Sequence, residues 1–258
     1  MEGGVRALWD PRLAARRVAR LIDEAGYVTA FTGAGISAES GVPTFRGKDG
    51  LWRSYRPEDL ATPIAFQRDP VRVWEWYKWR QELIYRARPN AAHHLLAELE
   101  RRGKLKAVIT QNVDGLHQRA GSGRVLELHG SIWRLICTTC GFTIHIERPV
   151  RDVPPRCPRC RGVMRPGVVW FGEPLPTLVY LEAEREAERS SLMLVIGTSG
   201  VVYPAGEIPF IAKRAGATIV NVNLEENVYS AIADVEVRSR AAEFARLLAE
   251  ELGIELPV

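Results

Sequence analysis

Residues 27–37 read YVTAFTGAGIS: a short run of apolar and β-branched residues that ends in two closely spaced glycines. Similar apolar runs recur further along the chain, at residues 105–110, 125–128, 192–197 and 218–222. They are largely apolar throughout instead of alternating, which is typical of parallel strands covered on both faces. Helical patterns precede and separate the runs, at residues 11–25, 90–102, 177–189, 205–215 and 241–252. This order predicts an α/β fold with a Rossmann-like, doubly wound parallel sheet.

Two segments interrupt the predicted sheet. Residues 48–87 are predicted to form a helical insertion, and residues 132–167 hold all four cysteines among many turn residues. The remaining residues make up the predicted Rossmann-like domain, in three pieces at 1–47, 88–131 and 168–258. A chain of 258 residues is long enough for one large domain with a small zinc-binding module inserted in it.

The four cysteines have the spacing of a zinc site. Cys137 and Cys140 form one pair, Cys157 and Cys160 form a second, and the two pairs are a loop of ribbon length apart. Each pair supplies two thiolates to one edge of a tetrahedron, which is the geometry that zinc adopts with four sulfurs. Because sulfur takes every position, we predict one structural Zn²⁺ with no site left open for water.

Glycines and polar residues follow each predicted strand. The carboxyl ends of parallel strands lie at one edge of a sheet, and ligands bind outside that edge. Gly33 and Gly35 permit a tight turn and a close approach to a phosphate, although a purely structural turn would use the same glycines. The other strand ends supply amide, carboxylate, hydroxyl, imidazole and glycine groups, at residues 111–117, 129–130, 197–200 and 221–225. Their convergence predicts a nucleotide site.

His129 follows one of these strands and has no second histidine or cysteine at metal-ligand spacing. A lone histidine often has a structural role. Its position at the predicted ligand edge equally fits a general base, because an imidazole changes protonation state near neutral pH. We interpret His93, His94 and His145 as structural.

One predicted helix, which begins at Asp69-Pro70, has a charge in its apolar stripe. Arg80 lies seven residues after Val73, where the stripe requires an apolar side chain. A buried guanidinium needs an anionic partner, and Tyr77 projects from the same side of the helix. Tyr77 and Arg80 together suit a carboxylate ligand. The alternatives are an internal ion pair of Arg80 with an Asp or Glu, or extension of its side chain to solvent.

The composition excludes several classes of protein. With 46% hydrophobic residues the chain can bury a large core, and none of its apolar runs reaches the length of a membrane span. A net charge of +4, with the basic residues scattered, gives no reason to expect a specific nucleic acid or a membrane as partner. The first residues, MEGG, lack the pattern of a secretion signal, so we expect a cytoplasmic protein. No feature indicates an oligomeric state.

Over nearly its whole length, the chain resembles the sirtuins, the NAD-dependent protein lysine deacylases. The motifs that carry the resemblance occur in family order: Gly33-Ala34-Gly35-Ile36-Ser37, Gly41-Val42-Pro43-Thr44-Phe45-Arg46-Gly47, Gln111-Asn112-Val113-Asp114-Gly115-Leu116-His117, Leu128-His129-Gly130, the four cysteines, Val169-x-Phe171-Gly172-Glu173, Gly197-Thr198-Ser199 and Asn223-Leu224-Glu225. Ala61-Thr62-Pro63 and Tyr77-x-x-Arg80 are similar to the desuccinylase and demalonylase subgroup, which removes acidic acyl groups as well as acetyl. Ser239 departs from the glycine that many members have near the adenine.

The resemblance implies an enzyme that uses NAD as a co-substrate to remove acyl groups from lysines of protein or peptide substrates, giving nicotinamide and O-acyl-ADP-ribose. It implies that His129 is the catalytic base. The residues implied to bind NAD are Gly33, Ala34, Gly35, Ser37, Phe45, Arg46, Trp52, Gln111, Asn112, Val113, Asp114, Gly197, Thr198, Ser199, Asn223, Leu224, Glu225 and Ala241. Those implied to bind the acyl-lysine substrate are Ala61, Tyr77, Arg80, Val169, Phe171, Gly172 and Glu173, the last four by adding a strand to the peptide.

Three other functions share part of this pattern. A mono-ADP-ribosyltransferase would use the same NAD site but would leave its target heavier by one ADP-ribose. An NAD-dependent dehydrogenase shares the sheet and the glycine turn, yet it gives no reason for the four cysteines. A zinc-ribbon protein that binds nucleic acid would need more positive charge than +4.

Overall fold

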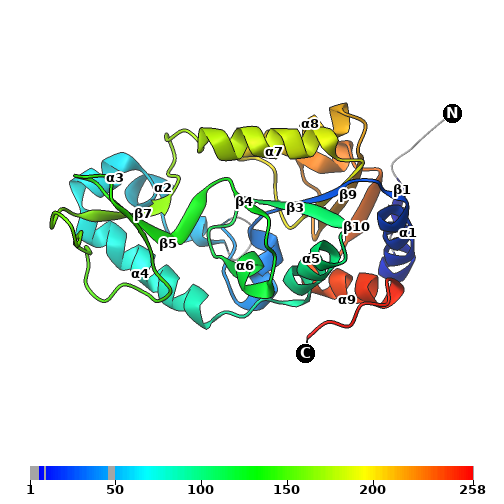
Figure 1. The fold of residues 1–258 in the computed structure, drawn as a ribbon, viewed down its shortest axis with the longest axis horizontal. Helices are drawn as coiled ribbons and strands as arrows, with labels where there is room; N and C mark the ends of the chain where they lie inside the picture. Colours follow the sequence, from blue (N-terminus) through cyan, green and yellow to red (C-terminus); the bar gives the residue numbers. More distant parts are fainter. Residues whose placement is uncertain (1–5, 9, 46–49, 258) are drawn as a thin grey trace.

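The computed structural model describes residues 6–8, 10–45 and 50–257, with the backbone alone for residues 6–8 and Trp52. Two lobes lie side by side (Figure 1). The larger lobe is built on a seven-stranded sheet, and the smaller one on a three-stranded sheet with helices beside it. None of the helices in the described part of the chain combines the length and the apolar character needed to cross a membrane.

The larger lobe confirms the predicted fold class. Every neighbouring pair of strands in its sheet is parallel, and the strand order is β1-β10-β9-β8-β2-β3-β4. The strands are β1 (Arg6–Leu8), β2 (Val28–Thr32), β3 (Leu105–Thr110), β4 (Val125–Glu127), β8 (Leu192–Ile196), β9 (Thr218–Asn223) and β10 (Val235–Arg238). Strands β1 and β10 were not predicted, because β1 is very short and β10, VEVR, alternates charged with apolar residues.

The order of the strands reverses at the middle of this sheet. From β2 the chain moves outward through β3 to β4, whereas β8, β9 and β10 lie on the opposite side of β2. The carboxyl ends of β2 and β8 therefore lie at a topological switch point, where a parallel sheet leaves a crevice for a ligand.

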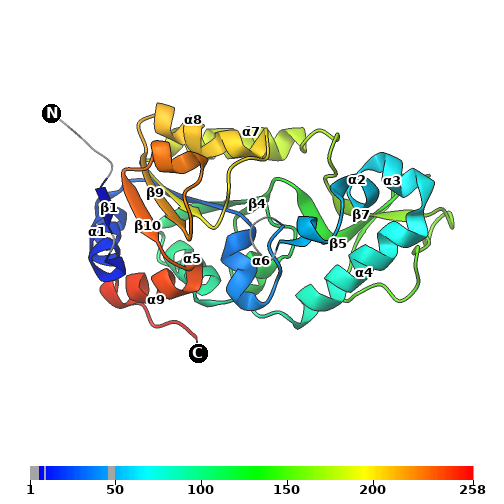
Figure 2. The same cartoon turned by 180° about the vertical axis from the view of Figure 1, so that it is seen from behind.

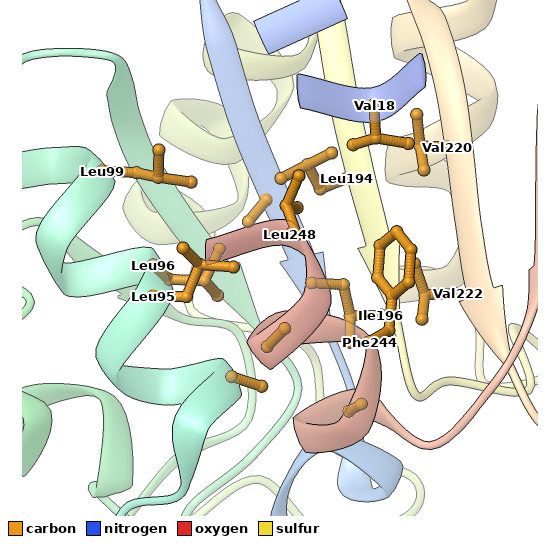
Figure 3. Packing of buried hydrophobic residues seen from close by; sticks show 14 of the residues in the cluster. Val18, Leu95, Leu96, Leu99, Leu194, Ile196, Val220, Val222, Phe244 and Leu248 are labelled. Atoms are coloured by element: carbon orange, nitrogen blue, oxygen red, sulfur yellow. The ribbon is translucent and has the colours of Figure 1, made fainter. Parts of the chain in front are cut away.

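Helices cover both faces of the sheet (Figures 1 and 2). Helices α1 (Pro11–Glu24), α5 (Ala91–Arg101) and α9 (Ala241–Glu251) cover one face, and α7 (Thr177–Arg189) and α8 (Ile208–Arg214) cover the other. Successive side chains of one strand enter different cores: Leu194 belongs to the core with α9, and Val195 to the core with α7. Figure 3 shows the first core, in which Leu194, Ile196, Val220 and Val222 of the sheet lie against Val18, Leu95, Leu96, Leu99, Phe244 and Leu248 of the helices.

Short helices complete the larger lobe. The helix predicted at residues 205–215 begins as a 3₁₀ turn, η3 (Ala205–Glu207), and continues as α8. The remaining short elements are α6 (Leu116–Ala120) and the 3₁₀ turns η1 (Ala34–Ser40) and η4 (Val228–Ala231), whereas the 3₁₀ turn η2 (Leu51–Arg53) falls in the first insertion, where Leu51 packs in the core of the smaller lobe.

The two insertions together form the smaller lobe. The first contains α2 (Pro57–Leu60), α3 (Pro63–Arg68) and α4 (Pro70–Arg86), and the second contains an antiparallel sheet of β5 (Gly130–Cys137), β6 (Thr143–His145) and β7 (Met164–Val168). Helix α4 is joined to this sheet by hydrogen bonds from Trp74 Nε1 to the carbonyl of Met164, at 2.7 Å, and from Gln81 Nε2 to the carbonyl of Ile132, at 2.9 Å. Both insertions contribute to one hydrophobic core. The domain boundaries given above stay a prediction.

Candidate active site

A cavity of about 1250 Å³ lies between the two lobes, outside the carboxyl ends of β2, β3, β4, β8 and β9. Most of the residues singled out in the sequence line it: Gly33, Ala34, Gly35, Phe45, Ala61, Tyr77, Arg80, Gln111, Asn112, Val113, His129, Val169, Phe171, Gly172, Glu173, Gly197, Thr198, Ser199, Asn223, Leu224, Glu225 and Ala241. Ser37 and Asp114 are buried behind its wall. Arg46 lies outside the described residues, as does the side chain of Trp52.

Glycines bring the loop after β2 against the loop after β8. The Gly35 N–H donates to the carbonyl of Gly197 at 2.8 Å, and a Cβ on Gly35 would lie only 2.7 Å from the Gly197 Cα. Gly197 has φ of 64°, in the left-handed region that favours glycine. The glycines thus bring the two loops at the switch point into backbone contact. The element that begins after Gly33 and contains Gly35 is the 3₁₀ turn η1, not an α-helix.

A buried polar cluster holds Asn112 at the cavity wall. The Asn112 Nδ2 donates to Ser37 Oγ at 3.1 Å, and Ser37 Oγ donates to Asp114 Oδ2 at 2.7 Å. Asp114 Oδ1 accepts from the backbone N–H of Leu116. Since these bonds satisfy Ser37 and Asp114 internally, both residues position Asn112 from behind the wall.

Two histidines lie beneath this cluster. His93 Nε2 lies 3.4 Å from Ser37 Oγ, and His117 Nε2 lies 2.9 Å from Thr32 Oγ1. The centroids of the two imidazole rings are 5.0 Å apart. Burial lowers the pKa of His93 to about 3 and the pKa of His117 to about 3, so both rings are neutral at pH 7.

His129 presents one ring nitrogen to the cavity. Its Nδ1 lies 3.0 Å from the carbonyl oxygen of Gln111, which can only accept, so Nδ1 carries the proton and Nε2 keeps a lone pair. Burial lowers the pKa of His129, and the bond to Gln111 offsets part of this effect. The ring is therefore neutral at pH 7 and able to accept a proton on Nε2.

Arg80 is buried beside the cavity, with 8% of its surface exposed. Its Cζ lies 4.8 Å from the ring centroid of Phe45 and 4.9 Å from that of Trp76. Within residues 10–45 and 50–257, no carboxylate forms an ion pair with Arg80 and no group accepts a hydrogen bond from it. Burial lowers the pKa of this guanidinium. Neither alternative from the sequence, an internal ion pair or extension into solvent, describes its surroundings.

The segment that follows β7 forms another part of the wall. The Val169 N–H donates to the carbonyl of His129, and the Phe171 N–H donates to the carbonyl of Ala61, each at 2.9 Å. The Glu173 N–H donates to the carbonyl of Trp170. The N–H groups of Val169, Phe171 and Glu173 therefore already have acceptors within the chain.

Trp170, the variable position of the Val169-x-Phe171 motif, also lines the cavity. Its ring is buried, and its Nε1 lies 2.9 Å from the hydroxyl oxygen of Tyr77. No local pattern in the sequence singles out Trp170, because its partner Tyr77 lies in a distant helix.

The four cysteines come together in the smaller lobe, where β5 ends at Cys137. Their sulfur atoms lie within 4.8 Å of one another, and neighbouring sulfurs of Cys137, Cys140, Cys157 and Cys160 are 3.4 to 3.7 Å apart. Four sulfurs at about 2.3 Å from a tetrahedral zinc lie about 3.8 Å from each other, so the cluster fits this ion. None of the four lines the cavity.

The parallel sheet, the glycine contact at its switch point and the amide-lined cavity together define a nucleotide-binding protein of the Rossmann-like class, with a structural zinc module added. Comparison with known proteins identifies the family. The family model described as "Sir2 family" matches residues 33–204, and the chain belongs to this family, the sirtuins.

Relatives of known name and structure agree with this assignment. The NAD-dependent protein deacylase of Aeropyrum pernix is 60% identical over 238 residues, which are 92% of this chain and 97% of that protein. A Sir2 homologue crystallised with NAD is 47% identical, with a TM-score of 0.88 and 96% of each chain covered. A Sir2 variant bound to a deacetylated p53 peptide and 3′-O-acetyl-ADP-ribose is 39% identical, with a TM-score of 0.87, and covers 93% of this chain and 99% of its own.

Proposed function

We propose that this chain uses NAD to remove acyl groups from protein lysines, and that it accepts the acidic succinyl and malonyl groups as well as acetyl. As a member of the Sir2 family, whose relatives are named for this activity, the chain is an NAD-dependent protein deacylase. The preference for acidic groups rests on one observation. The Arg80 guanidinium lines the cavity beside Tyr77 with no partner among the described carboxylates.

The energetics of a buried guanidinium support this preference. Removing Arg80 from water without hydrogen-bond acceptors is costly, and that cost is offset when an anion enters the cavity. The distal carboxylate of a succinyl or malonyl group would accept from Arg80 and from the Tyr77 hydroxyl, whereas an acetyl group has nothing to offer either. Ala61, which also lines the cavity, leaves room for the longer chain.

We infer that NAD lies along the carboxyl edge of the sheet. Asn112 and the backbone of Val113 suit the nicotinamide carboxamide, which both donates and accepts hydrogen bonds. The glycine loops at residues 33–35 and 197–199 suit the phosphates, and residues 223–225 with Ala241 suit the adenosine. When bound, NAD supplies the C1′ carbon of its nicotinamide ribose as the electrophile for the acyl oxygen.

His129 is the catalytic base in this proposal. Its Nε2 accepts a proton from a ribose hydroxyl, and the bond from Nδ1–H to the Gln111 carbonyl keeps the ring in the required tautomer. Phe45, on the loop beside the cavity, excludes water from the reacting centre. The zinc has a structural role only, because sulfur occupies all four of its positions.

The test compares peptides that differ only in their acyl-lysine. We would incubate the protein and its Arg80→Met variant with NAD and either succinyl-lysine or acetyl-lysine peptide, and follow the products by mass spectrometry. Arg80→Met should lower kcat/KM for the succinyl peptide on the order of 10- to 100-fold, the effect of losing a charge-assisted hydrogen bond, with a much smaller change for the acetyl peptide.

The matched control is Arg72→Met, on an exposed position of the same helix, which should leave both rates unchanged. Equal loss with both peptides, or no succinyl turnover by the unmodified protein, would refute the acidic preference. A peptide heavier by one ADP-ribose would instead support the mono-ADP-ribosyltransferase alternative.

A further inference from the structure

One hydrogen bond connects the segment after β7 to the proposed acyl pocket. The Trp170 Nε1–H donates to the Tyr77 hydroxyl oxygen at 2.9 Å, across 93 residues of sequence. Both side chains are buried, with 3% of Trp170 and 2% of Tyr77 exposed, and both line the cavity. The bond is thus shielded from solvent, where a single hydrogen bond has its largest effect on orientation.

The direction of this bond decides what Tyr77 can do. An indole N–H only donates, so the phenol oxygen must act as the acceptor and its own O–H points elsewhere. Within the described part of the chain no group accepts that proton. Burial raises the pKa of Tyr77, so the phenol keeps its proton at neutral pH. The Tyr77 hydroxyl is therefore held as a hydrogen-bond donor without an acceptor, beside the Arg80 guanidinium.

Trp170 is itself fixed on three sides. The Arg165 guanidinium carbon lies 3.7 Å from the Trp170 ring centroid, and Arg165 also pairs with Glu173, with Nη2 at 2.8 Å from Oε2. The same Glu173 oxygen accepts from the Trp170 backbone N–H at 2.8 Å. On another side the Phe66 ring lies at a centroid distance of 5.1 Å. An indole held in this way has little rotamer freedom, which preserves the direction of its N–H.

We propose that Trp170 is a specificity-positioning residue: its Nε1–H orients the Tyr77 hydroxyl as a donor to the carboxylate of an acidic acyl group. This inference rests on the proposed preference for such groups. Because Val169 and Phe171 flank Trp170 on the proposed peptide segment, one residue joins the surface that receives the peptide to the pocket that selects the acyl group.

The experiment measures selectivity, defined as kcat/KM for the succinyl-lysine peptide divided by kcat/KM for the acetyl-lysine peptide. Trp170→Phe removes the indole donor and keeps an aromatic ring. We expect it to lower selectivity about tenfold, the effect of about 1.4 kcal/mol for one oriented hydrogen bond. Tyr77→Phe should have an effect of the same size. The double variant should lose no more than either single one, because both remove the same interaction.

Trp74→Phe is the matched control. Trp74 is a buried tryptophan of the same lobe whose Nε1 donates to the Met164 carbonyl at 2.7 Å, and it does not line the cavity. Its loss should reduce thermal stability and leave selectivity unchanged. If Trp170→Phe fails to fold, benzothienylalanine incorporated at position 170 removes only the N–H and keeps the shape of the ring.

The outcomes separate this inference from the proposed function. If Arg80→Met lowers selectivity and Trp170→Phe does not, the role of Trp170 is refuted and the acidic preference stands. If Trp170→Phe lowers both rates equally, its role is packing and the inference fails. If Arg80→Met also leaves selectivity unchanged, the acidic preference itself is refuted and the role of Trp170 with it.

Discussion

The Nδ1 atom of His129 lies 3.0 Å from the carbonyl oxygen of Gln111, so a hydrogen bond links the ends of two neighbouring strands. Gln111 follows β3 and His129 follows β4, and the parallel pairing of the two strands sets this distance. The contact fixes the tautomer of His129 and directs its Nε2 toward the cavity. We therefore expect both the turnover rate and its pH dependence to depend on His129.

We expect His129→Ala to keep its zinc and its fold while kcat falls by about 10²- to 10⁴-fold, the usual contribution of a general base. Because burial lowers the pKa of His129, the base stays neutral below its ordinary value of 6.5, and the acid limb of the kcat/KM profile should lie below that pH. A pH–rate profile measures both expectations. Undiminished turnover in the variant, or an acid limb above pH 6.5, would contradict the assignment.

Stability should fall as the pH is lowered from 6.5. His93 and His117 have a pKa of about 3 in the folded protein and about 6.5 in the unfolded chain, so between these values only the unfolded chain takes up their protons. The free energy of unfolding should then decrease by up to about 1.4 kcal/mol per pH unit for each ring.

Urea unfolding at pH 7.5, 6.5 and 5.5 measures this slope. His93→Gln should make the slope shallower, whereas His145→Gln, at an exposed position of β6, should not change it. A free energy of unfolding that stays constant across this pH range would contradict the buried, neutral state of the two rings.

Gly35→Ala should damage both stability and NAD binding. Its Cβ would meet the Gly197 backbone at 2.7 Å, and backbone atoms cannot move aside as a flexible side chain can. We expect a loss of about 1–3 kcal/mol in the free energy of unfolding. The control is Gly26→Ala, where a Cβ meets nothing within 4 Å. Thermal unfolding and calorimetric titration with NAD would measure both variants, and a Gly35→Ala protein as stable as the control would contradict the close contact.

The strands that are buried on both faces could be predicted from the sequence. Strand β10, which contains a buried charged residue, could not. β2 and β8 are fully buried and read as continuous apolar runs, so hydrophobicity identifies them. β10 contains Glu236, which is 2% exposed and would normally argue against a central strand. Asn221 Nδ2 donates to this carboxylate at 2.9 Å, and no local pattern predicts a partner 15 residues away.

The residues of the candidate site also differ in whether the sequence alone could identify them. Arg80 could be identified from one helix, because a charge in an apolar stripe is a local contradiction. The role proposed for Trp170 could not, since it depends on Tyr77, which is distant in the sequence and becomes a neighbour only when the two insertions share a core. The unusual position of Arg80 was thus predictable from its own helix, whereas the contact on which the proposal for Trp170 rests required the structure.

The zinc cluster should support the acyl pocket as well as its own module. Cys137 and Cys157 are buried in the same hydrophobic core as Trp76 and Tyr77 of α4, so loss of the metal should loosen the whole smaller lobe. We expect Cys157→Ser to lose its zinc, to unfold at a lower temperature and to show a higher KM for acyl peptide. NAD affinity should change much less, because the strand ends of the larger lobe supply most of that site. Metal analysis, thermal unfolding and separate titrations with NAD and peptide distinguish these effects. A zinc-free protein with unchanged KM for the peptide would mean that the metal stabilises only its own loops.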